Sequence, residues 1–216
     1  MGDMIRPWVL FVFLAALVSA SASSGMAGST KVTHSITRIL VLGDSLTEGY
    51  GVAKEEAFPA LLEQELRRTG HAEVQVINGG IGGSTSASGV SRLKWHLRAR
   101  PELIVIALGA NDGLRGLSLG ETRRNLAAVI ELARRQELKI LLAAMKLPPN
   151  YGKEYSRGFH RIYEDLARDH LLPWVPFLLE GVGGEPSMNL EDGIHPNEKG
   201  HRKIAATLKK HLEPLL

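Results

Sequence analysis

The sequence predicts a three-layer α/β/α sandwich built on a mostly parallel sheet of about five strands. Short aliphatic runs alternate with hydrophobic stripes at helical spacing from residue 38 to residue 213. The chain has 216 residues, and no linker, repeat or second domain interrupts the pattern. Its composition, 44% hydrophobic and 23% charged, is typical of a globular protein.

Four aliphatic runs and one run that contains prolines are the expected strands. The aliphatic runs are residues 38–42, 74–77, 103–108 and 140–145. The third is continuously apolar, which is typical of a strand covered on both faces. The fifth run, residues 173–177, contains Pro173 and Pro176, and each proline removes a donor from the ladder. That run can therefore form only an edge strand.

Between the strands, hydrophobic side chains recur at the three- and four-residue spacing of an amphipathic helix. Leu126, Val129, Ile130 and Ala133 form one such stripe. Further stripes lie at residues 58–66, 159–166 and 204–212, and Gly70 is expected to end the first of these helices. Strands that alternate with helices pair in parallel, and the helices then cover both faces of the sheet.

Charge and cysteine content exclude several classes of function. Lys and Arg number 26 and Asp and Glu 23, and this net charge of +3 is too small to indicate nucleic acid or a membrane surface. The sequence has no cysteine, which excludes disulfides, thiolate metal sites and a cysteine nucleophile. No two histidines have metal-ligand spacing on one helix, so we expect no metal and no cofactor.

The first 20 residues are typical of a secretory signal peptide. Arg6 precedes an unbroken apolar run at residues 8–18, and small residues then allow cleavage after Ala20 or Ala22. The run is shorter than the roughly 20 residues of a transmembrane helix, and an uncleaved N-terminal anchor is the alternative. We expect residues 21–35 to be a flexible lead-in. Residues 36–216 would form the folded domain of a protein exported to the bacterial periplasm or secreted.

Polar motifs follow three of the expected strands. They are residues 43–47 (Gly-Asp-Ser-Leu-Thr), 78–84 (Asn-Gly-Gly-Ile-Gly-Gly-Ser) and 109–113 (Gly-Ala-Asn-Asp-Gly). Ligands bind beyond the carboxyl ends of parallel strands, so these segments are candidates for a site. Ser45 would expose its hydroxyl there, the glycines would let backbone N–H groups approach an anion, and the Asn111 amide could donate to an oxyanion.

Each of these motifs also has a purely structural interpretation. Asp44 and Ser45 could cap the next helix, and Asn111 and Asp112 could satisfy their own turn. The glycines could form a flexible turn, and their spacing matches neither of the two common phosphate-binding patterns.

A fourth motif lies near the C-terminus, at residues 192–197. Asp192 and His195 are three positions apart, so the carboxylate can accept a hydrogen bond from one imidazole nitrogen within a single turn. That contact fixes the tautomer and leaves the other nitrogen free to act as a base. None of the other histidines has an aspartate at this spacing, and they are interpreted as surface or packing residues.

Together and in this order, the four motifs resemble the four blocks of the SGNH hydrolases, also called GDSL lipases and esterases, whose sandwich is flavodoxin-like. The resemblance covers about residues 38–213 and is closest to the bacterial periplasmic arylesterase, acyl-CoA thioesterase and lysophospholipase branch. Residues 111–116, 147–152 and 192–197 suggest that branch. In one departure, residues 83–86 read Gly-Ser-Thr-Ser where close relatives often carry Gly-Asp-Thr-Ser.

The resemblance implies a serine esterase that hydrolyses carboxylic esters, thioesters or lysophospholipids through an acyl-enzyme. Ser45 would be the nucleophile, His195 its general base, and Asp192 the residue that orients His195. The oxyanion hole would consist of the backbone N–H groups of Ser45 and Gly83 and the side-chain amide of Asn111. The expected partner is a small-molecule ester, thioester or lysophospholipid, with no nucleic acid and no stable membrane insertion after signal cleavage, and the expected state is a monomer.

The acyl group of such a substrate needs an apolar groove beside Ser45. Leu114 and Leu147 follow the third and fourth strands and are candidates to line it. Residues 111–117 contain two glycines and could move over a bound acyl chain. Asp44 and Asp112 have no evident chemical task, so we expect them to support loops.

Two other functions remain open at this stage. A carbohydrate or cell-wall acetylesterase of the same family would carry the same motifs and would differ in its acyl-chain preference. A non-catalytic periplasmic module could bind a ligand on the loop at residues 79–83, but it would not react with a fluorophosphonate.

Overall fold

The computed structural model describes Met1 and residues 37–216, and all five strands pair in parallel within one sheet. The sheet has the order β2-β1-β3-β4-β5. Its strands are β1 (Thr37–Gly43), β2 (Val74–Gly80), β3 (Leu103–Ala107), β4 (Lys139–Ala143) and β5 (Trp174–Val175). This sheet confirms the predicted fold class. Apart from Met1, the expected signal peptide and lead-in lie outside the described residues.

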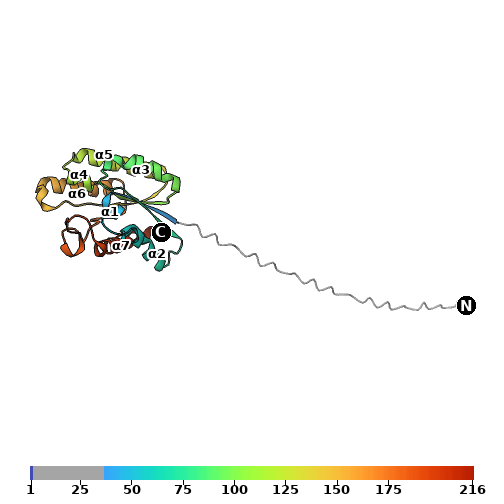
Figure 1. The fold of residues 1–216 in the computed structure, drawn as a ribbon. Helices are drawn as coiled ribbons and strands as arrows, with labels where there is room; N and C mark the ends of the chain where they lie inside the picture. Colours follow the sequence, from blue (N-terminus) through green and yellow to red (C-terminus); the bar gives the residue numbers. More distant parts are fainter. Residues whose placement is uncertain (2–36) are drawn as a thin grey trace. The chain divides into compact units, whose positions relative to one another are not determined.

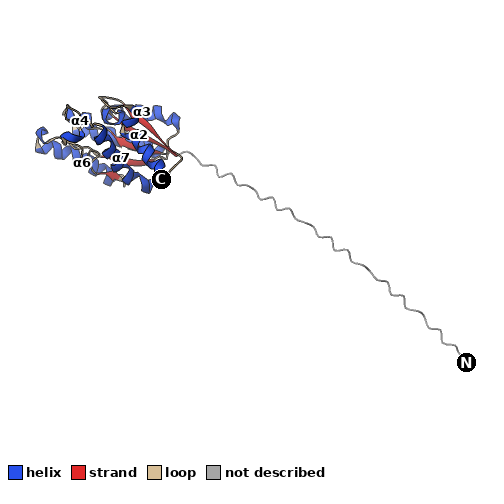
Figure 2. Cartoon of the chain, turned by 60° about the horizontal axis from the view of Figure 1, so that its bottom comes forward, coloured by secondary structure: helices blue, strands red, loops and turns tan. Residues whose placement is uncertain are grey.

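Helices cover both faces of the sheet, as Figures 1 and 2 show. On one face α2 (Phe58–Arg68) packs against α7 (Glu198–Leu212). The other face carries α3 (Gly89–His96), α5 (Leu119–Arg135) and α6 (Lys153–Asp169). Two short helices, α1 (Ser45–Glu48) and α4 (Ala110–Leu114), follow β1 and β3 directly.

The two central strands form the rigid base of the fold. Every residue of β3 and residues 39–42 of β1 are buried, because helices pack on both faces of the sheet. Burying an aliphatic side chain contributes roughly 1.5–3 kcal/mol relative to leaving it in water. The continuous apolar run at residues 103–108 was expected to lie between two layers, and the structure confirms this.

The structure departs from the expected elements in three places. β2 continues through Asn78 to Gly80 instead of ending at residue 77, since its glycines fit closely against β1 and α1. A Cβ on Gly80, for example, would lie 2.1 Å from the backbone nitrogen of Glu48. The edge strand pairs over only two residues. The sequence pattern also did not indicate α3, which is only eight residues long and begins at Gly89.

The strand order reverses direction between β1 and β3. β1 leads outward to β2 on one side, whereas β3 leads to β4 and β5 on the other. In open parallel sheets, ligands bind at the carboxyl ends of the strands beside such a reversal. The three strand-end motifs follow β1, β2 and β3, so they emerge at this edge of the sheet.

His201 is a buried residue of α7 that contacts α2. The N–H of Phe58, the first residue of α2, donates to His201 Nδ1 over 3.2 Å, and the two rings stack. The bond satisfies an N–H that the N-cap residue, Ala57, cannot reach with a side chain. Burial and, to a smaller extent, the nearby charge of His195 lower the pKa of His201 to about 4.

We expect the contribution of His201 to the free energy of unfolding to decrease as the pH falls from 6.5 towards 4. The unfolded chain protonates His201 near its ordinary value of 6.5, whereas the folded chain does so near 4. The neutral ring therefore favours the fold above pH 6.5, and this contribution is lost through that window. Its upper limit is about 3.5 kcal/mol, at roughly 1.4 kcal/mol per pKa unit.

Denaturant unfolding of wild type and His201→Asn at several pH values tests this expectation. Asparagine Oδ1 takes the place of Nδ1 as an acceptor for the Phe58 N–H but does not titrate, so the variant should lose less stability between pH 6.5 and 4. Equal pH slopes in the two proteins would contradict the role of His201.

Candidate active site

The turn between β1 and α1 places Ser45 at the carboxyl edge of the sheet. Asp44 caps α1 because its Oδ1 accepts the N–H of Leu46 over 3.1 Å, and Ser45 is the first helical residue. A Cβ on Gly43 would lie 1.9 Å from Thr47 Oγ1, so the turn requires glycine there. Ser45 remains partly exposed at the edge of the sheet.

His195 and Asp192 approach Ser45 from the loop that precedes α7. His195 Nε2 lies 3.0 Å from Ser45 Oγ, and His195 Nδ1 lies 2.7 Å from Asp192 Oδ2. When Nδ1 donates its proton to Asp192, Nε2 is left to accept the proton of the Ser45 hydroxyl. The structure thus brings the three residues of the expected triad into one continuous line of contacts.

The surroundings of Asp192 favour its ionised form. Its Oδ1 accepts the backbone N–H groups of His195 and Ile194, each over 2.9 Å. The N–H of His195, the imidazole of His195 and the N–H of Ile194, in decreasing order of effect, lower the pKa of Asp192 to about 2. A carboxylate that stays charged at neutral pH can both orient the imidazole and stabilise an imidazolium.

Tyr50 packs against the imidazole of the triad. The Tyr50 and His195 ring centroids are 4.4 Å apart, and the planes are tilted by 39°. Gly49, with a φ of +90°, ends α1 and directs the chain to Tyr50. No local sequence pattern indicates this contact, because the two residues are far apart along the chain.

Asn111 lies at the same edge, one residue into α4. Its Nδ2 donates to the carbonyl of Ser84 over 3.1 Å and to Asp44 Oδ2 over 3.4 Å. Gly109 allows the turn before it, because its φ is +110° and a Cβ there would lie 2.2 Å from the Tyr163 hydroxyl. The Asn111 amide is therefore held between the Ser45 turn and the loop at residues 81–86, called the glycine loop below.

The two backbone N–H groups expected in the oxyanion hole have no acceptor among the described residues. Within the described part of the chain, the N–H groups of Ser45 and Gly83 donate no hydrogen bond. Gly83 has a φ of +71°, a left-handed conformation that favours glycine. Both N–H groups thus remain available to an incoming oxyanion.

Residues of the α4 region hold the glycine loop in place. Arg115 Nη2 donates to the carbonyl of Gly83 over 2.9 Å. Asp112, which is only 2% exposed, accepts the Ser86 N–H over 2.8 Å and the Ser86 hydroxyl over 2.5 Å. Hydrogen bonds to a carboxylate are roughly twice as strong as those between neutral groups. The expectation that Asp112 supports a loop is confirmed.

Asp44 is likewise buried and supports the Ser45 turn, as expected. Its burial raises the pKa to about 6. Hydrogen bonds from the backbone and from Asn111, together with the charge of His195, oppose this effect. The carboxyl group is thus held as a helix cap rather than presented to a substrate.

The segment that carries Leu114 and the segment that carries Leu147 lie next to each other at the same edge of the sheet. A Cβ on Gly113 would lie 2.5 Å from Leu147 Cδ2, so the segment after β4 packs directly on α4. Tyr151 and Tyr155 then hold the following loop, because their hydroxyls donate to the carbonyls of Leu114 and Leu117 over 3.1 and 2.7 Å. The role of these two leucines in binding the acyl group stays a prediction. The movement of residues 111–117 over a bound acyl chain also stays a prediction.

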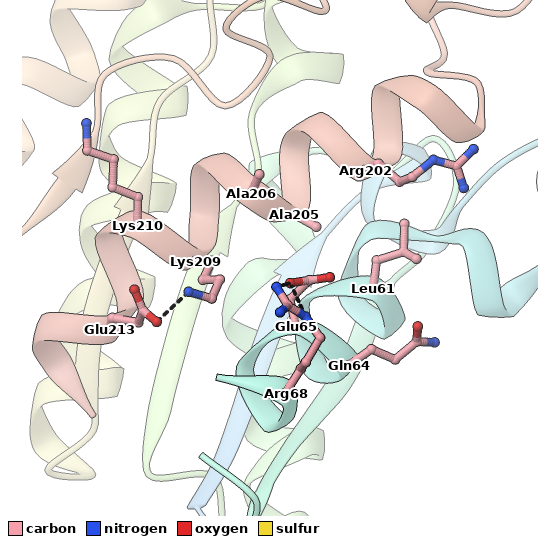
Figure 3. A pocket seen from close by; sticks show the side chains of 10 residues that line it. All are labelled: Leu61, Gln64, Glu65, Arg68, Arg202, Ala205, Ala206, Lys209, Lys210 and Glu213. Atoms are coloured by element: carbon pink, nitrogen blue, oxygen red, sulfur yellow. Dashed lines mark hydrogen bonds and ion pairs between the residues drawn. The ribbon is translucent and has the colours of Figure 1, made fainter. Parts of the chain in front are cut away.

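A separate cavity of about 490 Å³ lies between α2 and α7 (Figure 3). None of its lining residues belongs to the four motifs. Glu65 pairs with Arg68 over 2.7 Å, and Glu213 pairs with Lys209 over 2.5 Å. Paired charges along neighbouring helices are typical of a solvated surface, so this cavity indicates no ligand.

Neither a metal cluster nor a membrane-spanning element is found in residues 37–216. No three His, Asp or Glu side chains of this region lie close enough together to hold an ion. Its helices are all too short or too polar to cross a bilayer.

Comparisons with known proteins show the family to which the chain belongs. Residues 41–203 match the model of the GDSL-like lipase/acylhydrolase family. The chain is 40% identical to esterase TesA of Pseudomonas aeruginosa over 82% of this chain and 89% of the relative. It is 39% identical to an arylesterase of Vibrio mimicus over 81% of this chain and 90% of the relative. Thioesterase 1/protease 1/lysophospholipase L1 of Escherichia coli is 36% identical over 82% of this chain and 84% of its own length.

Solved structures give the same result. The crystal structure of TesA superposes with a TM-score of 0.80 at 40% identity, over 83% of this chain and all of that one. AlinE4, an esterase of the SGNH-hydrolase family, superposes with a TM-score of 0.69 at 40% identity, over 83% of this chain and 96% of its own.

Proposed function

Because the chain belongs to the GDSL-like lipase/acylhydrolase family, we propose that Ser45 carries out its ester hydrolysis through an acyl-enzyme. Family membership confirms the resemblance that the four motifs indicated. The chain is a carboxylic ester hydrolase, in line with its relatives named esterase, arylesterase and thioesterase/lysophospholipase. The observation that supports the proposed mechanism is the contact series from Ser45 Oγ through His195 to Asp192.

Acylation begins when Ser45 Oγ attacks the carbonyl carbon of the ester. The hydroxyl proton passes to His195 Nε2, which lies 3.0 Å away. The resulting imidazolium is stabilised by Asp192, whose carboxylate is 2.7 Å from Nδ1. As the bond to the leaving group breaks, Nε2 returns the proton to the departing alcohol or thiol. A water molecule then repeats these steps on the acyl-enzyme and frees Ser45.

The negative charge that develops on the substrate oxygen needs donors already in place. We assign this role to the N–H groups of Ser45 and Gly83 and to the Asn111 amide. The two backbone donors have no competing acceptor within the described residues and need no rearrangement at the moment of reaction. The Asn111 amide donates to the Ser84 carbonyl and, over 3.4 Å, to Asp44 Oδ2, so it gives up the longer of these two bonds to donate to the oxyanion.

For the substrate, we propose esters and thioesters whose acyl part contacts Leu114 and Leu147, and lysophospholipids as a further class. The names of two relatives, an arylesterase and a thioesterase/lysophospholipase, favour these over a carbohydrate acetylesterase. The enzyme would act as a monomer without a cofactor. It would be exported to the periplasm or secreted, as the sequence of residues 1–20 predicts.

Ser45→Ala should abolish both turnover and covalent labelling. The wild-type protein should react with a fluorophosphonate probe at Ser45, because His195 Nε2 lies 3.0 Å from that hydroxyl and can activate it. Peptide mapping of the labelled protein and hydrolysis of p-nitrophenyl butyrate check both points. Wild-type rates in the Ser45→Ala protein would rule out the mechanism.

Asn111→Ala should lower kcat by roughly 100-fold or more, the usual cost of removing one oxyanion donor. The fold should be intact, which a thermal melt of the same preparation would verify. If the variant retained wild-type kcat with a normal melt, the oxyanion would have to be stabilised by other donors.

A further inference from the structure

Arg92 of α3 extends to the carboxyl ends of β1 and β2. Its Nη2 donates to the carbonyl of Gly43 over 2.6 Å and also to the carbonyl of Gly79. Gly43 is the last residue of β1, and Gly79 lies one residue before the end of β2. One nitrogen thus joins two neighbouring strands at their carboxyl ends.

These carbonyls lie where the ladder of the parallel sheet ends. After Gly43 the chain turns into α1, whereas β2 runs on into the glycine loop. The next rung, from the N–H of Ile81 to the carbonyl of Gly43, is long at 3.4 Å. Arg92 supplies a charged donor at this point, and such a bond is stronger than a neutral backbone bond.

The two segments that start here carry the proposed nucleophile and an oxyanion donor. Ser45 is two residues beyond Gly43, and Gly83 is four residues beyond Gly79. Acyl transfer depends on the separation of these groups, and a misplacement of about 1 Å can cost a hundredfold in rate.

Stability alone does not account for a cation at this position. The Arg92 side chain is half-buried, and its Nε and Nη1 are buried without a hydrogen-bond partner in the described residues. Burying an incompletely paired charge is costly, and an apolar side chain of similar length would fill the same space without that cost. Burial lowers the pKa of the Arg92 guanidinium, and the charge of Asp44, next to Ser45, opposes this effect.

We propose that Arg92 is a positioning residue that sets the distance between the Ser45 turn and the glycine loop that carries Gly83. The inference rests on the proposed function, since it concerns the same reaction. Arg92 does not contact the substrate. It acts by fixing the strand ends from which the two reacting segments begin, and its loss should therefore affect the chemical step more than substrate binding.

Arg67 provides a matched control at the opposite end of the same strand. Its Nε donates to the carbonyl of Val74, the first residue of β2, over 2.8 Å. Arg67→Met thus also removes an arginine that binds a strand carbonyl, but it does so far along the strand from the proposed site.

The test compares Arg92→Met, Arg92→Gln and Arg67→Met with wild type in p-nitrophenyl butyrate hydrolysis, with a thermal melt of each protein. We expect kcat to fall about 10- to 100-fold in both Arg92 variants, with KM changed by less than about twofold. Arg67→Met should change the melting temperature but keep kcat within about twofold of wild type.

The inference is overturned if a folded Arg92 variant keeps wild-type kcat, or if Arg67→Met loses as much kcat as Arg92→Met. If Arg92→Met does not fold, Arg92→Gln carries the test with the same criteria, because glutamine still offers one donor. Labelling of wild type by a fluorophosphonate separates the two proposals. An unlabelled Ser45 would refute the proposed function, whereas a labelled Ser45 with fully active Arg92 variants would refute only the role of Arg92.

Discussion

The parallel pairing of β1 with β2 and β3 is the interaction on which the whole site depends. In this register Gly43 lies opposite Gly80 on one side and Ala107 on the other. Ser45, Gly83 and Asn111 lie two, three and four residues beyond that rung. Three segments distant in sequence therefore start from one line across the sheet, and short turns are enough to bring their functional groups together.

The polar groups of the site are supported by apolar strands. The apolar side chains of β1 and β3 are buried on both faces, so the sheet holds its edge in place without help from the loops. Charged groups near the edge are then tied to backbone: Asp44 accepts the Leu46 N–H and Asp112 the Ser86 N–H. The loop that carries Asp192 and His195 follows none of β1, β2 and β3, and its own backbone N–H groups orient Asp192.

Local sequence patterns were enough to predict the strands, the main helices and the residues that meet at the sheet edge. They worked because periodicity and strand-end motifs depend on neighbours along the chain. Contacts between residues distant along the chain leave no such pattern. For this reason the packing of Tyr50 on His195 and the bond from Arg92 to the Gly43 carbonyl are seen only in the structure. His201 was interpreted as a surface or packing residue, and its buried bond to Phe58, 143 positions away, could not be seen in the sequence.

The most direct test of this account is a crystal structure of the protein after reaction with a phosphonate ester. The phosphonyl group would stand in for the tetrahedral intermediate. We predict a bond from phosphorus to Ser45 Oγ, with one phosphonyl oxygen about 2.7–3.1 Å from the N–H groups of Ser45 and Gly83 and from Asn111 Nδ2. Attachment to another residue, or an oxygen that none of these three donors reaches, would contradict the account.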